Sequence, residues 1–526
     1  MVSTKRSTLS NFFCLSLGFS FVLSWLWFPI VDIDIWWHLK TGEFIWKYQK
    51  FFRTDIFSYT AFGEPWTHHE WLFSVLYYLL HRFFGSAGII FLRLVVGLGL
   101  FWALYKTAVW LTENRWISLL TSGLAFAMLS VRMTDRAAMY STLGLCLVLM
   151  ITTGVQKGIL SRRSYFWFFA IFFLWANLHA GVILGLVFLL IFWGPVIIKH
   201  YSSTPTHKRR WFEREEALLC LLFLVIFLNP LGWRIVTFPF ENLGLSVARS
   251  HVMEWLSAFH PQAVKSVEAQ WMPILFLGLG VFLFLGGRWV PLPYILCLAL
   301  SAFMSTQAIR FVAEFACTAV PFSSLLLERG FKKWGLQKNL PLGMLLILFG
   351  FSIHHVWQQG SLKTQEAKIL NSALPHYTPD LMEFLNQNQI HGRVFNDLNL
   401  GASFLYFRSP TDRVFIDTRQ SVYGDSFFRD YLLAASSPKK FEQLSQKLGG
   451  FDYLLLEYWE YAPSVNLHAY LWQQPDWYLV YFSQKGFIYV RRTPSSEQLI
   501  QKFGFRNPPL SLKDMVPGIL PKNILN

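Results

Sequence analysis

The feature that most constrains the fold is a run of apolar residues near the N-terminus. Residues 11–30, NFFCLSLGFSFVLSWLWFPI, contain no charged side chain, and similar runs recur along the first two thirds of the chain. A helix of roughly 20 apolar residues crosses a bilayer. Only 15% of the 526 residues are charged, against about 25% in soluble domains, and the mean hydropathy is +0.37. The sequence therefore predicts a polytopic α-helical membrane protein.

About eleven spans are predicted, near residues 9–30, 86–111, 116–131, 138–155, 165–178, 180–198, 215–230, 271–287, 290–306, 309–327 and 339–357. The first is longer than the apolar core of a secretory signal, about 7–15 residues, so we expect it to be retained. Three short loops, at 156–164, 199–214 and 328–338, are rich in lysine and arginine, which is typical of the cytoplasmic side. If the N-terminus is cytoplasmic, successive spans alternate in direction and place all three loops in the cytoplasm. This pattern accounts for the formal net charge of +15, and no nucleic-acid partner is expected.

The loop at 31–85 then lies on the outer side, although it carries several basic residues, because long loops follow the charge rule poorly. Within it, residues 70–84, EWLFSVLYYLLHRFF, are apolar but short for a span. We expect an interfacial helix that leads into the next span. The alternative, in which 70–84 itself crosses, would invert the topology of everything downstream.

The hydropathy changes after the predicted membrane domain of residues 1–360. Short β-rich runs such as GRVFND, DRVFIDTR and FDYLLLE alternate with helical segments, which predicts a soluble α/β domain over residues 361–526. An odd number of spans places it on the outer, extracytoplasmic side. We expect Asp417 to cap the following turn and pair with Arg419; the alternative is a ligand site at the strand ends. All five cysteines lie in predicted spans, which argues against a disulfide framework.

Polar and ionisable residues gather on the predicted outer face. Such groups at a membrane span cost a few kcal/mol each and usually face a cavity or a partner. They predict a polar chamber that opens outward, although carboxylates can simply end a helix and arginines can meet lipid headgroups. The candidate residues are Asp32, Asp34, His38, His69, Glu70, Arg136, His179, Arg234, Glu254 and Arg310.

The segment VDIDIWWHL resembles the acidic motif after the first span of the GT-C superfamily of integral-membrane glycosyltransferases. Residues 68–111 resemble the next stretch of the protein mannosyltransferase and aminoarabinose-transferase branch, in which a span carries an arginine, here Arg93. The chain has HEWL at 69–72 where that branch has a Pro-Pro-Leu segment. It is more similar to a group of bacterial membrane proteins that share DxDxWWHL, HEWL, WANLH, NPxGW and VFIDxR. The GT-C layout covers roughly residues 1–330.

The resemblance implies a glycosyltransferase that moves a sugar from a polyprenyl-phosphate donor to an acceptor at the outer face of the bacterial cytoplasmic membrane. The acceptor would be an envelope glycan, a lipid or a protein. Such a reaction needs a carboxylate to take the acceptor proton and positive charge to stabilise the departing phosphate. The resemblance favours Asp32 or Asp34 as the base; we prefer Asp34, beside WWHL. Glu70 is expected to supply a second catalytic carboxylate or, with His69, to orient the acceptor.

The remaining candidates would bind substrate, and the arginines suit a lipid phosphate. The substrate-binding set is His38, His69, Arg136, His179, Arg234, Glu254 and Arg310. If the Asp-x-Asp segment is extended, Asp32 and Asp34 point the same way and can share a Mg²⁺ or Mn²⁺ ion; in a helix they diverge. Two other classes stay open: a scaffold that has lost activity, and a lipid flippase or transporter, which predicts broken helices and inverted repeats.

Overall fold

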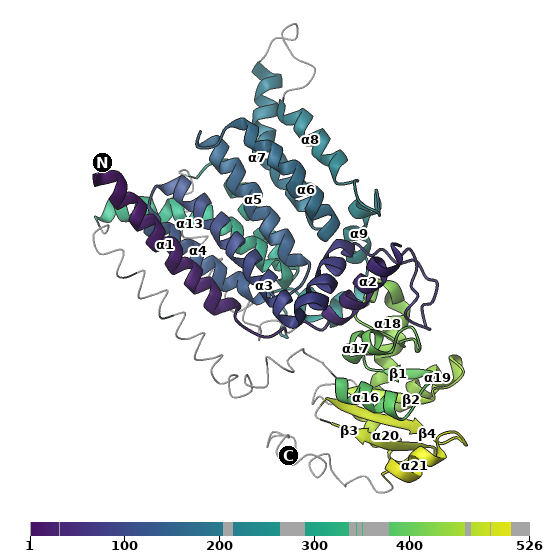
Figure 1. The fold of residues 1–526 in the computed structure, drawn as a ribbon. Helices are drawn as coiled ribbons and strands as arrows, with labels where there is room; N and C mark the ends of the chain where they lie inside the picture. The colour runs from purple at the N-terminus through teal and green to yellow at the C-terminus, as the bar shows by residue number, and fades with distance from the viewer. Residues whose placement is uncertain are drawn as a thin grey trace.

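The computed structural model describes residues 2–30, 32–203, 214–262, 290–335, 343, 350, 378–457, 464–483 and 485–505. Long helices form one body, and an α/β domain lies against one end of it (Figure 1). The long helices are α1 (Val2–Leu26), α3 (Trp71–Thr112), α4 (Arg115–Leu129), α5 (Ala138–Gln156), α6 (Trp167–Leu178), α7 (Val182–Ser203), α8 (Arg214–Val225), α12 (Leu292–Gln307) and α13 (Val312–Trp334).

Three of the described helical segments are long and apolar enough to cross a membrane: Trp71–Thr112, Ala138–Gln156 and Ile309–Lys333. Shorter apolar helices cover Phe12–Leu26, Arg115–Leu129, Val182–Ile198 and Leu292–Gln307. The predicted helical membrane body is therefore confirmed in type. The predicted number of spans is not established, because 271–287 and all of 339–357 except residues 343 and 350 lie outside the described residues, as does the predicted domain boundary near residue 360.

The loop at 31–85, which is predicted to lie on the outer side and is called the first outer loop below, contributes α2 (Ile35–Tyr48) and the start of α3. Helix α3 changes direction at Gly85, whose φ of 59° and ψ of −152° are not helical. Glycine has no Cβ and adopts positive φ at little cost, so it allows the break. The break falls between the predicted interfacial segment, 70–84, and the predicted span that follows it.

Helices α2 and α3 pack closely at Gly42. A Cβ atom at this position would lie 2.1 Å from the Ser74 carbonyl oxygen and 2.8 Å from Tyr78 Cβ. Only glycine therefore permits the observed approach. The contact matters for the site because the Ser74 hydroxyl lies 2.7 Å from His38 Nδ1 and 3.0 Å from His68 Nε2.

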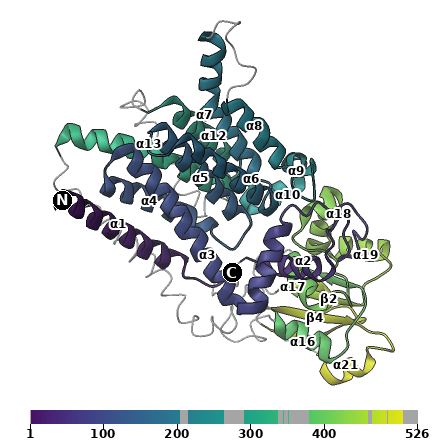
Figure 2. The same ribbon diagram turned by 45° about the horizontal axis from the view of Figure 1, so that its top comes forward.

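Short helices and turns lie between the long helices in the chain. They are α9 (Arg234–Leu243), α10 (Ser246–His251) and the 3₁₀ turns η1 (Ser130–Arg132), η4 (Met253–Trp255) and η7 (Ile309–Phe311). Figures 1 and 2 show α2 and α9 at the end of the body that faces the α/β domain, and Figure 2 also shows α10 there. The Ser246 hydroxyl and the Val247 N–H both donate to Asp425 of α18, which joins α10 to that domain.

The α/β domain has one mixed sheet in the order β1-β2-β4-β3. Strand β1 pairs with β2 in parallel, and the other two pairs are antiparallel. The strands are β1 (Val394–Asn396), β2 (Tyr453–Glu457), β3 (Trp477–Phe482) and β4 (Gly486–Arg491); the helices are α16 (Pro379–Gln387), α17 (Leu398–Arg408), α18 (Gln420–Ser436), α19 (Pro438–Lys447), α20 (Val465–Leu471) and α21 (Glu497–Phe503). Central strand β2, YLLLE, is buried along its whole length, as expected for a strand covered on both faces.

One predicted strand is used differently. The run around Val414 joins none of the named strands and instead pairs with the first outer loop of the membrane body. The Val414 N–H donates to the Phe57 carbonyl at 3.0 Å, and the Tyr59 N–H donates to the Val414 carbonyl at 3.1 Å. The predicted strand is therefore only an isolated bridge, and its partner lies in the loop at 31–85.

Replacement of Gly42 with alanine should destabilise the protein by about 1–3 kcal/mol, since the methyl group overpacks the contact between α2 and α3. Chemical denaturation of the purified full chain in detergent measures the change. Gly194→Ala is the matched control: it also lies inside a helix, and its Cβ would meet nothing within 4 Å. The control should be unchanged or slightly more stable, because alanine favours helix. Equal stability of the two variants would contradict the packing argument.

Candidate functional site

A polar cavity of about 370 Å³ lies between the membrane body and the α/β domain. The first outer loop, η1, η4, η7, α9, α10 and the start of α18 all contribute to its wall. Its charged and polar lining includes Asp34, His38, His68, His69, Glu70, Arg132, Arg136, His179, Arg249, His251, Glu254, Arg310, Asn399, Thr418, Arg419, Gln420 and Ser421. Both halves of the protein are thus needed to form it.

Three carboxylates converge on the guanidinium of Arg136. Its Nε donates to Asp32, its Nη1 donates to Glu254, and its Nη2 lies 3.5 Å from Asp34 Oδ2. The three acidic residues come from the segment between α1 and α2, the N-cap of α2 and η4. Burial alone would lower the pKa of Arg136, but these carboxylates hold it well above its usual value. Arg136 therefore carries a permanent positive charge among the three carboxyl groups.

The turn before α2 sets the position of Asp34. Asp32 Oδ1 accepts the Asp34 N–H at 2.8 Å, and Asp34 has φ −66° and ψ −19° at the helix start. The segment is therefore a turn, not the extended strand in which both aspartates would share an ion. The Thr418 hydroxyl donates to Asp34 from the α/β domain. Burial and the neighbouring Asp32 raise the pKa of Asp34 to about 7.

Two more arginines meet Glu254 on its other side. Arg132 Nη1 lies 3.1 Å from Oε2, and Arg310 Nη1 lies 3.6 Å from Oε1. The Arg310 guanidinium also stacks 4.1 Å from the Trp255 ring. Burial would raise the pKa of Glu254, but the three arginines hold it below its usual range. Arg132 and Arg310 share this one carboxylate, so their remaining guanidinium donors suit an anionic ligand.

A different cluster surrounds Glu70. Its Oε1 lies 3.4 Å from His69 Nε2 and 3.8 Å from His179 Nε2, and its Oε2 lies 3.6 Å from His38 Nε2. Burial lowers the pKa values of His38 and His179 to about 3, so both rings are neutral at physiological pH. The ligand atoms of His69, Glu70 and His179 lie within 4.8 Å of one another, close enough to hold one metal ion.

A second cavity, of about 290 Å³, adjoins the polar one. The two share His69, Arg132, His179 and Arg310, and the rest of the second cavity is mainly apolar. Its apolar wall includes Ile183, Leu184, Val187, Phe238, Pro239, Met304 and Phe311. The arginine pair thus stands where a polar chamber meets an apolar one.

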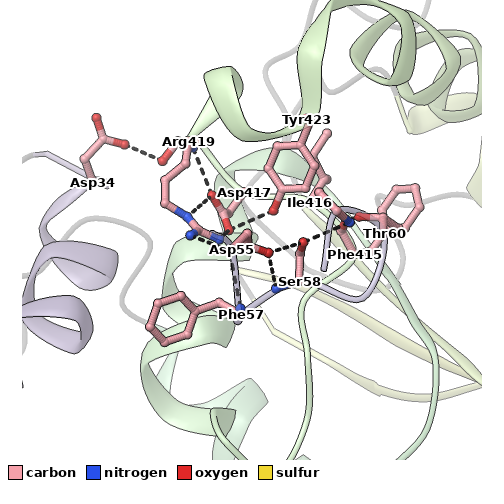
Figure 3. Close-up of polar contacts among 12 residues, drawn as sticks. Asp34, Asp55, Phe57, Ser58, Thr60, Phe415, Ile416, Asp417, Arg419 and Tyr423 are labelled. Atoms are coloured by element: carbon pink, nitrogen blue, oxygen red, sulfur yellow. Dashed lines mark hydrogen bonds and ion pairs between the residues drawn. The ribbon is translucent and has the colours of Figure 1, made fainter. Parts of the chain in front are cut away.

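A buried ion network holds the α/β domain against the first outer loop (Figure 3). Arg419 Nη1 donates to Asp55 at 2.7 Å, and its Nε and Nη2 donate to Asp417 at 2.9 and 2.6 Å. The Tyr423 hydroxyl donates to Asp417 at 2.9 Å. The side chains of Arg419, Asp417 and Asp55 are at most 1% exposed. The predicted Asp417–Arg419 pair is confirmed, and Asp55 extends it across the domain interface.

Aromatic and backbone contacts complete this interface. The Arg419 guanidinium lies 4.6 Å from the Trp66 ring, and the Thr60 hydroxyl donates to the Phe415 carbonyl at 2.5 Å. Asn396 holds the same segment from within the domain, since its amide donates to the Ile416 carbonyl at 2.7 Å. The position of Thr418, and through it that of Asp34, is therefore tied to the sheet.

Eight of the ten predicted site residues line the polar cavity: Asp34, His38, His69, Glu70, Arg136, His179, Glu254 and Arg310. Asp32 is not among the lining residues; its carboxylate accepts a hydrogen bond from Arg136, which lines the cavity. Arg234 is exposed and lines a separate hollow with Lys50 and Arg53. The roles predicted for these residues stay predictions.

Sequence reasoning did not select Thr418 or Asp55. Thr418 lies between the two residues that the VFIDTR motif singled out, so its neighbours were the available signal. Asp55 is an aspartate in a long loop, with no pattern that marks it as buried. Its partner is 364 residues away in the sequence.

The fold, a helical body with first-loop helices followed by an α/β domain, is similar to that of a solved oligosaccharyltransferase. This is the archaeal oligosaccharyltransferase AglB of Archaeoglobus fulgidus in complex with an inhibitory peptide and a dolichol-phosphate. That structure has 11% identity, a TM-score of 0.55, and an alignment over 92% of this chain and 74% of the other. The predicted GT-C resemblance is confirmed at the level of the fold.

The A. fulgidus enzyme tethered to an acceptor peptide with an NVT sequon aligns over the same shares, at 10% identity and a TM-score of 0.56. Its apo form aligns over 85% of this chain and 69% of the other, at 10% identity and a TM-score of 0.51. No family model and no curated protein matches the chain.

Replacement of Arg419 with alanine should cost about 3–5 kcal/mol of stability, because two buried carboxylates lose their cation. The free energy of unfolding, measured by denaturation of the full chain in detergent, tests this. Arg429→Ala removes an exposed arginine from the same domain and should change nothing measurable. Equal effects of the two substitutions would show that the network does not hold the domains together.

Proposed function

We propose that this protein is a glycosyltransferase that moves a sugar from a polyprenyl-phosphate donor to an acceptor at the outer face of the membrane. The observation that carries the proposal is one cavity with a carboxylate, Asp34, an arginine-rich wall and an apolar extension. These are the three elements that the reaction requires: a base, charge stabilisation for a phosphate, and space for a lipid. The GT-C fold supports the reaction class.

Asp34 acts as the general base. It removes the proton from the acceptor nucleophile as that atom attacks the anomeric carbon, and the phosphate departs from the opposite face, with inversion. A base is most effective when its pKa lies near the working pH. Burial and Asp32 place the pKa of Asp34 at about 7, while Arg136 and Thr418 fix the orientation of the carboxylate.

Arg132 and Arg310 bind the donor phosphate. Guanidinium groups form charge-assisted hydrogen bonds to phosphate oxygens and stabilise the negative charge that develops on the leaving group. Both arginines line the apolar cavity as well as the polar one, so the first isoprene units would extend into the apolar cavity. Glu254 holds the two guanidinium groups in place before the donor arrives.

The A. fulgidus structures support a lipid-linked donor, since one of them contains a dolichol-phosphate. They also contain peptides, one of them an acceptor. For this chain the acceptor would enter on the side formed by the α/β domain, where Asn399, Gln420 and Ser421 supply neutral hydrogen-bonding groups. These groups suit a hydroxyl-rich or amide acceptor.

The donor site is tested by mass spectrometry of the purified protein. The wild type should retain a phosphate-bearing isoprenoid, and the double variant Arg132→Ala/Arg310→Ala should lose it. Arg234→Ala is the matched control, because this arginine lies outside both cavities. Absence of any isoprenoid from the wild type, or equal retention in the double variant, would contradict the assignment.

The base is tested by the pH dependence of transfer from a radiolabelled polyprenyl-phosphate hexose in membranes. Asp34 must be ionised to act, so the rate should fall as the pH drops through about 7. Thr418→Val removes a hydrogen bond that stabilises the ionised carboxylate. The acid limb of the pH–rate profile, where the rate falls, should therefore move to higher pH. Asp34→Asn should lower the rate by about 10²–10⁴-fold.

Two controls separate this effect from general damage. Thr418→Ser keeps the donated hydrogen bond and should keep the wild-type limb. Glu64→Gln changes an exposed carboxylate of the same outer loop and should leave the rate unchanged. An unshifted limb in Thr418→Val, or full activity in Asp34→Asn, would remove Asp34 as the base.

A further inference from the structure

We propose that His69, Glu70 and His179 bind one divalent transition-metal ion of the zinc class in the wall of the polar cavity. The site is distinct from the Asp32–Asp34 pair for which the sequence suggested Mg²⁺ or Mn²⁺. Binding of the ion does not depend on the proposed function; any part that it plays in transfer does. Two imidazoles and a carboxylate are a ligand set that zinc commonly uses, with a fourth position left open.

The spacing of the three ligand atoms fits such an ion. Bonds of about 2.0–2.1 Å in a tetrahedral site separate neighbouring ligand atoms by about 3.3 Å. Glu70 Oε1 lies 3.4 Å from His69 Nε2 and 3.8 Å from His179 Nε2. The ligand nitrogens of His69 and His179 lie within 4.8 Å of each other. A small inward rotation of the rings would therefore complete three ligands, and the fourth position faces the cavity that all three residues line.

The charges around Glu70 leave room for a cation. Within the described part of the chain, the basic side chains within 4.0 Å of its carboxylate are three histidines, and no lysine or arginine is among them. Arg136, in contrast, already supplies positive charge and hydrogen-bond donors to the carboxylates of Asp32, Asp34 and Glu254. A metal ion would have to displace that guanidinium. The structure thus favours the histidine cluster over the aspartate pair.

Surrounding contacts hold the two imidazoles. The His69 ring packs against Phe238 with centroids 4.0 Å apart. His179 Nδ1 lies 2.6 Å from Ser141 Oγ, which accepts the Trp175 indole N–H at 2.7 Å. Partners of this kind orient metal-binding histidines and tune their affinity.

The hydrogen bonds of His179 predict a change of tautomer. The Gly181 N–H donates to His179 Nδ1 at 3.1 Å, which places the proton of the neutral ring on Nε2, facing Glu70. A metal on Nε2 requires that proton on Nδ1 instead, where Ser141 Oγ can accept it. Ser141 should therefore contribute to affinity without touching the ion.

The test uses the full chain in detergent, stripped with a chelator and then titrated with Zn²⁺ or Co²⁺. Elemental analysis after gel filtration should give one ion per chain, and Co²⁺ should give the intense visible band of tetrahedral coordination. Glu70→Gln, His69→Ala and His179→Ala should lose the ion. Ser141→Ala should weaken binding by about 10-fold or more, as loss of a supporting contact typically does.

Matched controls keep the result interpretable. His251→Ala removes another cavity histidine, and Asp34→Asn removes the candidate base; both should keep the ion. Glu70→Gln preserves shape, and its thermal unfolding verifies that it folds. Absence of stoichiometric metal in the wild type, or retention by all three cluster variants, would overturn the site. Loss in Asp34→Asn with retention in Glu70→Gln would overturn it in favour of the aspartate pair. Metal binding in a chain without transferase activity would reject only the proposed function.

Discussion

The convergence of three carboxylates on Arg136 is the interaction on which the rest of the site depends. Asp32 follows α1, Asp34 begins α2 and Glu254 lies in η4, so one guanidinium fixes three segments of the membrane body. An unpaired charge is costly to remove from water, whereas shared partners offset that cost. Two further arginines, Arg132 and Arg310, share Glu254 with Arg136. The cavity keeps its polar lining because these charges are arranged as one network.

The α/β domain is a structural part of this cavity. Arg419 bridges Asp55 of the first outer loop and Asp417 of its own domain, and the neighbouring Thr418 donates to Asp34. A cation between two buried carboxylates holds the interface only in one arrangement, since each lost contact would leave a buried charge alone. The orientation of the candidate base therefore depends on how two domains dock.

Two chemically different regions lie side by side in one chamber. Around Arg136 the carboxylates are matched by guanidinium groups, which keep their protons at any physiological pH. Around Glu70 the partners are imidazoles, and burial holds His38 and His179 neutral. A neutral imidazole is a metal ligand, while a guanidinium is a phosphate ligand. The cavity thus separates a wall for an anion from a wall that can take a cation.

The sequence by itself determined the helical membrane body, the α/β character of the C-terminal domain and eight of the polar residues that line the cavity. Apolar run lengths and charge placement carry that information locally, because the bilayer acts on each segment separately. Only the tertiary structure decided that Asp32 faces Arg136, that Arg234 lies elsewhere, and that Val414 pairs with Phe57 across domains. These outcomes depend on long-range contacts between charges and backbone groups, for which spacing along the chain gives no signal.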